Sequence, residues 1–379
     1  MFSANDTNEV RLTADTVRQS MTWRDPGPSL VVLGRVLVEG LQNPVLTLPP
    51  GLSVTFAFGA GFVVGKNAPG GLTIGAASGA PVSLVTTDPN GWAGIVFFPS
   101  ALSSELTNAV LENCGSYNDS GYGQGCIFAI GNSFGTAPAP VLRNVTIRRA
   151  VDAGVALIAG GRLGTGSNDL VITETRGSPG SPFSIYGGDV SSIPSGQYTG
   201  NERDVIWILN GEVARSQSWG DHGVPYSLYG GLLVGHATEP ILTLEAGVVM
   251  HFAPGAFLAA GVASPGGLRA LGTDGNPVVL TGDFASRGAW MGVHIGPRAQ
   301  ATTVLDHVIV ENAGGDDGQI AAAIRIARDY GEIVQHTTIR GSAGCGITRM
   351  SGATWTTDFT AAHLNNTFEE NAGPNQCGP

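Results

Sequence analysis

The stretch NPVLTLPPGLSVTF, residues 43–56, decides the fold because it returns as EPILTLEAGVVMHF at residues 239–252. The two stretches begin 196 residues apart, at residues 43 and 239. At this offset Leu46, Leu48 and Phe56 are each matched by an identical residue. In both copies an apolar segment, a turn with glycine and a second apolar segment follow one another, which is typical of two short strands joined by a tight turn. The chain therefore contains one structural unit in two copies.

The repeat extends over most of the chain. PGGL occurs at residues 69–72 and 265–268, WAGI from Trp92 matches WMGV from Trp290, and TIRRAVDAG from Thr146 matches TIRGSAGCG from Thr338. The offset changes between these matches, as expected where insertions fall in surface loops. A Pro/Gly/Ser-rich joint covers residues 177–200. We therefore expect two tandem homologous units, residues 1–200 and residues 201–379.

Composition and rhythm indicate an all-β chain. There are 57 glycines in 379 residues and only 13% charged residues, which favours many turns. Apolar segments such as VLTL, LTIG and VSLV recur about every eight to thirteen residues, with turn residues between them. The stretch from Ala14 to Met21 is the one segment with plausible helical spacing.

Two all-β architectures fit this rhythm, antiparallel sandwiches and a parallel β-helix. Asn-Gly hairpin signals are scarce, and short apolar strands on both sides of a turn suit stacked coils filled by ladders of like residues. We therefore favour the β-helix, in which one copy would hold about eight coils of about 22 to 28 residues.

These phrases resemble secreted bacterial proteins with right-handed parallel β-helix repeats of the pectate-lyase-like superfold. In that family, phrases of the form PxLTIxPGvxvxF, GxLxAxGTxxxPVxFT, GxWxGIxF and LxxxxIxxaG follow one another along successive coils. The second copy has EPILTLEAGVVMHF, GGLRALGTDGNPVVLTGD, GAWMGVHI and LDHVIVENAGG in that order. The resemblance implies a right-handed parallel β-helix, but the superfold includes lyases and hydrolases as well as surface proteins, so it implies no single activity.

Charge and hydropathy exclude two classes of partner. The net charge is −11 and no basic run occurs, so there is no electrostatic footprint for nucleic acid or for anionic lipid. No apolar run approaches the roughly 20 residues of a spanning helix, so we expect no membrane insertion.

The four cysteines favour disulfides and an extracellular or cell-surface location. Cys114 and Cys126 flank a polar, glycine-rich loop, and Cys345 could be joined to Cys377 near the end of the chain. Three pairings are possible, and the sequence does not choose among them. A metal site is disfavoured because CxxC and CxxH spacings are missing.

A polysaccharide lyase would need clustered carboxylates that hold Ca²⁺ against a sugar acid, with an Arg base on the neighbouring coil. The candidates in this chain are Glu311, Asp316, Asp317, Arg325 and Arg328. The doublet at residues 316–317 also resembles that of polygalacturonases, although the other residues of that hydrolase pattern are missing. We favour the alternative that these residues belong to solvated turns between coils, without a cofactor.

All seven histidines lie in the second copy. Those flanked by apolar neighbours are expected to point outward from strands. The first copy has Thr55, Val96, Ala109 and Asn144 at the positions that we take as equivalent to His251, His294, His307 and His336. A function shared by both copies therefore cannot depend on them, and we favour scattered surface residues over a metal site or an acid sensor.

Aromatic side chains suggest a third possibility, a lectin-like glycan binder. Tyr117 and Tyr122 lie in the loop between the first two cysteines and could stack on sugar rings. The tryptophans recur in both copies, as Trp92 and Trp290 do, which favours structural packing for them.

The sequence as a whole predicts a secreted or surface-displayed, non-catalytic structural or adhesive module. Coil ends expose unpaired backbone, so end-to-end self-association into filaments is a possible partner interaction. A polysaccharide lyase or glycoside hydrolase acting on acidic polysaccharide is the alternative, and a glycan binder is the second alternative.

Overall fold

The computed structural model describes residues 8–116, 125–132, 137–187, 189–315, 318, 320–350, 352–353 and 356–378. Over these ranges the chain is a parallel β-helix: short strands alternate with turns, and strands of successive coils pair in parallel, as β4 does with β7 and β5 with β8. It divides into two compact units, residues 1–206 and residues 207–379. The division falls six residues after the expected boundary at residue 200.

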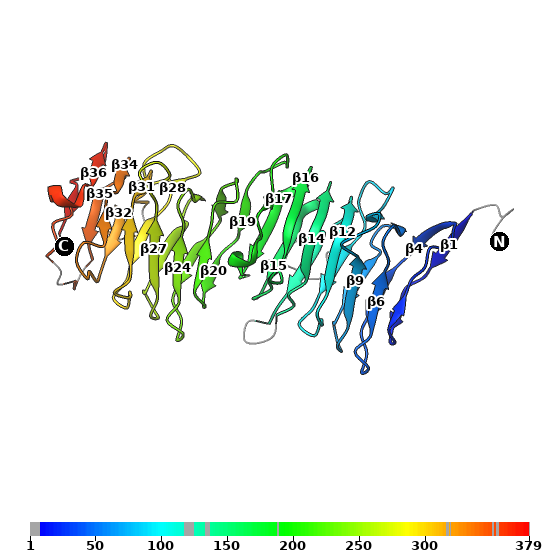
Figure 1. The fold of residues 1–379 in the computed structure, drawn as a ribbon. Coiled ribbons are helices and arrows are strands. Elements are labelled where there is room, and N and C mark those ends of the chain that lie inside the picture. The colour runs from blue at the N-terminus through cyan, green and yellow to red at the C-terminus, as the bar shows by residue number, and fades with distance from the viewer. Residues whose placement is uncertain are drawn as a thin grey trace. The chain divides into compact units, whose positions relative to one another are not determined.

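Unit 1 is built from short strands, as Figure 1 shows. In its first half these strands recur three to a coil. One sheet contains β1 (Glu9–Leu12), β4 (Ser29–Val32), β7 (Ser53–Phe56), β10 (Val82–Val85), β12 (Glu105–Glu112), β14 (Val141–Arg148), β16 (Asn168–Thr173) and β18 (Gly196–Gln197). Three further strands, β3 (Met21–Thr22), β6 (Val45–Leu48) and β9 (Gly71–Gly75), pair in series and join β12. The other sheet contains β2 (Asp15–Val17), β5 (Arg35–Val38), β8 (Gly61–Val64), β11 (Gly94–Phe97), β13 (Ile127–Ile130), β15 (Val151–Ile158) and β17 (Arg176–Tyr186). A 3₁₀ turn, η1 (Val190–Ser192), follows, and β19 (Ile206–Ile208) crosses the division between the units.

Unit 2 has three parallel sheets. The first contains β20 (Gly211–Val213), β23 (Gly231–Val234), β26 (Phe257–Ala260), β29 (Gly292–Ile295), β32 (Ala322–Ile326), β35 (Cys345–Arg349) and β37 (Gln376–Cys377). The second contains β21 (Gln217–Trp219), β24 (Ile241–Leu244), β27 (Gly267–Leu271), β30 (Val304–Asp306) and β33 (Val334–Gln335). The third contains β22 (Tyr226–Leu228), β25 (Val249–Phe252), β28 (Val278–Gly282), β31 (Val308–Glu311), β34 (Thr338–Arg340) and β36 (Thr367–Glu369), with a 3₁₀ turn, η2 (Ala362–Leu364), before the last strand.

The interior of each unit is a ladder of apolar side chains. In unit 1 the register aligns Val54, Leu84, Leu111, Ile147 and Ile172 on successive coils, and all five are fully buried. Alternation along each strand turns every second side chain inward, so a four-residue strand such as VLTL contributes two residues to the stack. Burial of each such side chain contributes about 1.5 to 3 kcal/mol, and repetition over the coils stabilises the unit.

The stretch from Ala14 to Met21, the one segment with plausible helical spacing, is not helical, in agreement with the all-β prediction. Asp15–Val17 forms β2, which pairs with β5 through Val17 and Val38. Val17 is buried. The backbone N–H and C=O groups of this segment form hydrogen bonds with the neighbouring strand instead of the hydrogen bonds within a helix.

The coils are longer than the sequence suggested in places. The β2-containing sheet of unit 1 has seven strands over the described residues, against about eight coils expected. Between β11 and β13 the start of the strand advances from Gly94 to Ile127, which is 33 residues. Insertions in turns therefore lengthen individual coils without changing the pairing of the strands.

Two disulfides, Cys114–Cys126 and Cys345–Cys377, join the four cysteines. The first joins Cys114, two residues after β12, to Cys126, the residue before β13, and both cysteines are fully buried. The second links the adjacent strands β35 and β37. Such cross-links are typical of proteins outside the reducing cytosol.

Candidate functional site

The strongest cluster of chemically active side chains is formed by Asp306, His307 and His336 in unit 2. Asp306 is the last residue of β30, and His307 is the single residue between β30 and β31. His336 follows β33, the strand that pairs with β30 and sets Asp306 opposite Gln335. Two consecutive coils therefore each have a histidine at the same corner, the bend that follows β30 in one coil and β33 in the next.

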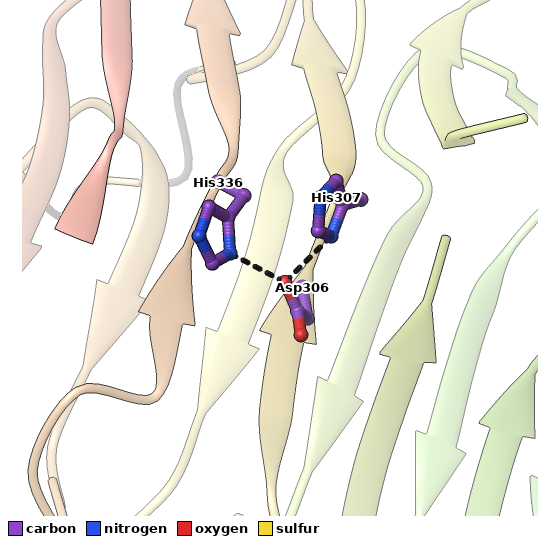
Figure 2. A group of neighbouring side chains, drawn as sticks. All are labelled: Asp306, His307 and His336. Atoms are coloured by element: carbon purple, nitrogen blue, oxygen red, sulfur yellow. Dashed lines mark hydrogen bonds and ion pairs between the residues drawn. The ribbon is translucent and has the colours of Figure 1, made fainter. Parts of the chain in front are cut away.

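Left-handed backbone places both histidines on this corner. His307 has φ of 53° and His336 has φ of 48°, a conformation in which the chain bends sharply between two sheets. The imidazole rings consequently stack, with centroids 4.6 Å apart and planes inclined by 17°. The two rings stand over one carboxylate, as Figure 2 shows.

One oxygen of Asp306 is shared by both imidazoles. Oδ1 lies 2.8 Å from Nδ1 of His307 and 2.9 Å from Nδ1 of His336. The other oxygen accepts a hydrogen bond from the side chain of Gln335 at 3.0 Å. On its far side, His307 Nε2 lies 3.0 Å from Oδ1 of Asp274, an almost fully exposed carboxylate. The cluster thus combines two imidazoles with an inner and an outer carboxylate.

The surroundings favour the ionised form of Asp306. Partial burial acts to raise the pKa of this carboxyl group, but the hydrogen bonds from His336 and Gln335 and the charge of nearby His307 outweigh it and lower the pKa below its ordinary value. The three side chains are 24 to 39% exposed, so solvent and small ions reach them. Two imidazoles and one ionised carboxylate form a set of ligands suited to first-row transition metals.

Unit 1 has amides where unit 2 has imidazoles. Asn108 and Asn144 have φ of 52° and 49°, and the side chain of Asn144 donates to Oδ1 of Asn108 at 3.1 Å. The register identifies Asn108, not Ala109, as the equivalent of His307, because Ala109 pairs with Val82 as Val308 pairs with Val278. The equivalence of Ala109 and His307 expected from the sequence is therefore wrong by one residue.

The candidate lyase residues in the described part of the chain each have a partner of their own. The carboxylate of Glu311 forms an ion pair with Arg340 at 2.6 Å, across the β31–β34 ladder. Arg325 is 2% exposed and donates to the carbonyl oxygen of Gly315 at 3.4 Å. Arg328 lies over the ring of Tyr330, 4.8 Å from its centroid. Asp316 and Asp317 lie outside the described residues, so a Ca²⁺ site that includes them stays a prediction.

The tyrosines expected to contact glycans, Tyr117 and Tyr122, also lie outside the described residues. The tryptophans of the repeat are structural: Trp92 and Trp290 are fully buried and Trp219 is 2% exposed. His251 and His294 are half-buried on strands whose flanking apolar residues are fully buried, as strand alternation predicts.

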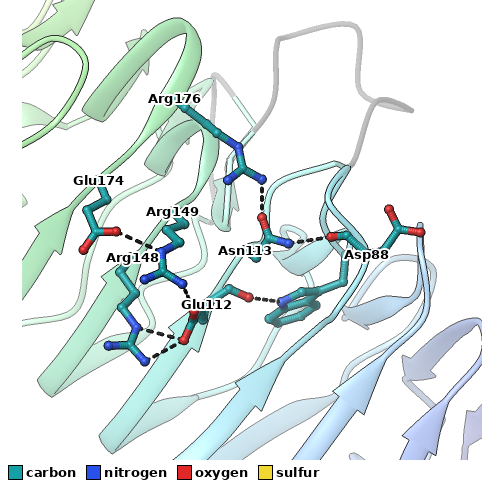
Figure 3. A network of polar contacts seen from close by, with 8 residues as sticks. Asp88, Glu112, Asn113, Arg148, Arg149, Glu174 and Arg176 are labelled. Atoms are coloured by element: carbon teal, nitrogen blue, oxygen red, sulfur yellow. Dashed lines mark hydrogen bonds and ion pairs between the residues drawn. The ribbon is translucent and has the colours of Figure 1, made fainter.

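A network of ion pairs links three coils of unit 1 on its surface (Figure 3). Glu112 accepts from Arg148 at 2.8 Å and also pairs with Arg149. Arg149 in turn pairs with Glu174 at 2.8 Å. Glu112 and Arg148 are register partners, as Glu311 and Arg340 are in unit 2. Both units therefore place a carboxylate and a guanidinium opposite each other at the end of equivalent strands.

Two surface cavities of about 440 and 420 Å³ lie in unit 1. The first includes Arg18 and Glu39, and the second includes Arg162 and Asp189. Each carboxylate already accepts hydrogen bonds from the protein itself. Glu39 accepts from the backbone and side chain of Asn67, and Asp189 accepts from the backbone and side chain of Ser191.

Comparisons of the chain with protein-family models, with curated proteins and with solved structures find no match. In the described ranges, no helix has the length and apolar character needed to cross a membrane. Sequence reasoning missed the corner histidines as a cluster. The available signal was their spacing of 29 residues, about one coil, together with the preceding aspartate.

Proposed function

We infer that this chain is a non-catalytic structural or adhesive module of a secreted or surface-exposed protein. The observation that carries the inference is the pairing of charged groups between coils. Glu105 pairs with Arg143, Glu112 with Arg148, and Glu311 with Arg340. Each pair joins adjacent coils, and in the third pair Arg340 neutralises Glu311, a candidate lyase carboxylate that a lyase would need free in a groove.

The two disulfides support the extracellular part of the proposal, because they persist in oxidising compartments. A stack of coils with covalent cross-links resists local opening and presents its turns at fixed positions. These are the properties that a display or adhesion module requires.

Self-association through coil edges is the second part of the proposal. Among the described residues, β1, β2 and β3 pair on one side only, through β4, β5 and β6. A strand edge with free N–H and C=O groups can accept another strand. Sedimentation velocity over a wide concentration range is expected to show larger species that dissociate on dilution; a monomer at all concentrations would remove this part.

Activity assays test the non-catalytic part. The full chain, incubated with pectin, alginate and neutral glycans with and without Ca²⁺, is expected to release neither unsaturated uronate ends nor reducing ends. The matched variants are Asp316→Ala with Asp317→Ala and Arg325→Gln. Product formation that these variants abolish would establish a lyase or hydrolase in place of the structural module.

A further inference from the structure

We propose that Asp306, His307 and His336 bind one divalent transition-metal ion, with Zn²⁺ as the reference ion, through Oδ1 of the aspartate and Nδ1 of each histidine. One ligand atom from each residue lies within 4.8 Å of the other two. The proposal goes beyond the structural module, because nothing in the role of a stacked coil requires a metal.

The directions of the three side chains support this assignment. Both Nδ1 atoms face the same carboxylate oxygen, at 2.8 and 2.9 Å. Zn²⁺ binds imidazole nitrogen and carboxylate oxygen at about 2.0–2.2 Å, which places tetrahedral ligand atoms about 3.4 Å apart. The carboxylate oxygen therefore needs to withdraw by about half an ångström, while the stacked rings tilt toward each other. Rotation about the side-chain bonds would supply these shifts, and the partial exposure of all three side chains leaves room for it.

Two neighbouring side chains, those of Asp274 and Gln335, could orient the metal ligands by hydrogen bonds. With Nδ1 on the ion, the proton of His307 lies on Nε2, where Oδ1 of Asp274 accepts it at 3.0 Å. A carboxylate in this position fixes the tautomer and makes the ring a better donor to the metal. Gln335 holds Oδ2 of Asp306 at 3.0 Å, so that Oδ1 is the oxygen left for the ion.

The backbone brings the ligands together before any ion binds. The left-handed corner residues occur on consecutive coils, and β30 pairs with β33 in a register that fixes their separation. Three protein ligands leave a fourth position open to water or to a donor from another molecule. A bound ion would therefore join two coils and remain accessible from outside.

Unit 1 supplies the control substitutions. Its residues at the three positions are Thr107, Asn108 and Asn144, and asparagine is among the residues that tolerate left-handed backbone best. His307→Asn, His336→Asn and Asp306→Thr therefore remove the ligands and retain the conformation that the fold already accommodates. His363→Ala is the matched control outside the cluster, because the exposed His363 pairs with Glu332 at 3.0 Å and is not one of the three ligands.

Calorimetric titration of the metal-free full chain, without an affinity tag, with Zn²⁺ tests the proposal. We expect one saturable site, weakened at least 100-fold by His307→Asn or His336→Asn and about 10-fold by Asp274→Asn, with His363→Ala unchanged. Visible absorption of Co²⁺ in the same site should show bands that the two asparagine variants lack. Circular dichroism identifies any variant that does not fold. Absence of saturable binding, or binding that both asparagine variants retain, would overturn the site and leave a hydrogen-bonded cluster only.

Discussion

The indole N–H of Trp92 donates a hydrogen bond to the backbone carbonyl oxygen of Glu112, 3.0 Å away. Unit 2 repeats this bond between Trp290 and Glu311 at 2.9 Å. Each indole also stacks on a phenylalanine of the preceding coil, with centroids about 4 Å apart. The same buried contact thus joins neighbouring coils in both units.

Truncation of either indole is expected to destabilise its unit. Trp92→Ala leaves a cavity beside Phe56 and should lower the free energy of unfolding by about 3–5 kcal/mol. Trp92→Phe keeps an aromatic ring and should cost about 1–2 kcal/mol, because it leaves a buried carbonyl without its donor. Chemical denaturation measures both values, with Phe58→Ala at an exposed position as the near-neutral control. Equal effects of Trp92→Ala and the control would refute the packing role.

Two glycines, Gly65 and Gly261, are expected to resist substitution. Both have φ of 67°, and a Cβ at either would lie 2.2 Å from a backbone nitrogen of the following coil. Gly65→Ala or Gly261→Ala should therefore cost several kcal/mol or prevent folding, because the clash adds to the strain of left-handed backbone. Gly59→Ala and Gly255→Ala are matched controls with positive φ and open space, and should cost about 1–2 kcal/mol. The measurement is soluble yield followed by thermal unfolding; similar losses in all four variants would contradict the steric argument.

The two disulfides should differ in their resistance to reduction. Cys114 and Cys126 are fully buried, whereas Cys377 is partly exposed. Under native conditions, increasing thiol reductant is expected to open Cys345–Cys377 first, because thiolate attack requires access to a sulfur. Differential alkylation with mass spectrometry gives the order of opening. Removal of either bridge by paired Cys→Ser substitution should cost about 3–4 kcal/mol on the loop-entropy model. Simultaneous reduction of both bridges in the folded chain would contradict the prediction.

Glu105 should make stability depend on acidity. Its pKa is lowered by hydrogen bonds from Thr107 and from Arg143, which outweigh the opposing effect of partial burial. A lowered pKa stabilises the folded chain above the ordinary pKa of 4.5, and this contribution is lost as the pH falls through the folded value. Because the pair is exposed, Glu105→Gln should cost only about 0.5 kcal/mol at neutral pH and make no difference near pH 2. Denaturant midpoints of both proteins across this range test it, and parallel curves would count against the pairing.

The strands and the parallel architecture could be predicted because apolar residues alternate with turn residues in a local rhythm. The segments around Leu46, Val54 and Leu84 each form the strand that their pattern predicts. The strand that contains Val17 could not be predicted, because a three-residue strand has too few residues to show its period, and its partner β5 supplies the missing stabilisation. The local pattern of apolar and turn residues therefore predicts most strands, whereas the shortest strands form only because they pair with a neighbouring strand.

Contacts across coils could not be predicted residue by residue, because each depends on the length of the intervening turns. The step from Asn108 to Asn144 is 36 residues, whereas that from His307 to His336 is 29. For the same reason the pairing of Glu311 with Arg340, on the next strand of its sheet, could not be predicted from the sequence. One inserted residue changes which side chains meet, so the corner cluster could be recognised only once the register was fixed.

Because strands form hydrogen bonds with the strands of the next coil, the coil is the unit by which such a chain can become longer or shorter. Within each unit a strand bonds to the strand three further along in much of the chain, as β5 does to β8 and β23 does to β26. If one complete coil were removed, the strands on either side of it could pair directly. These strands are parallel and both have apolar side chains facing the interior. Natural variants are therefore expected to gain or lose whole coils, while deletion of part of a coil interrupts the interior ladder and is selected against.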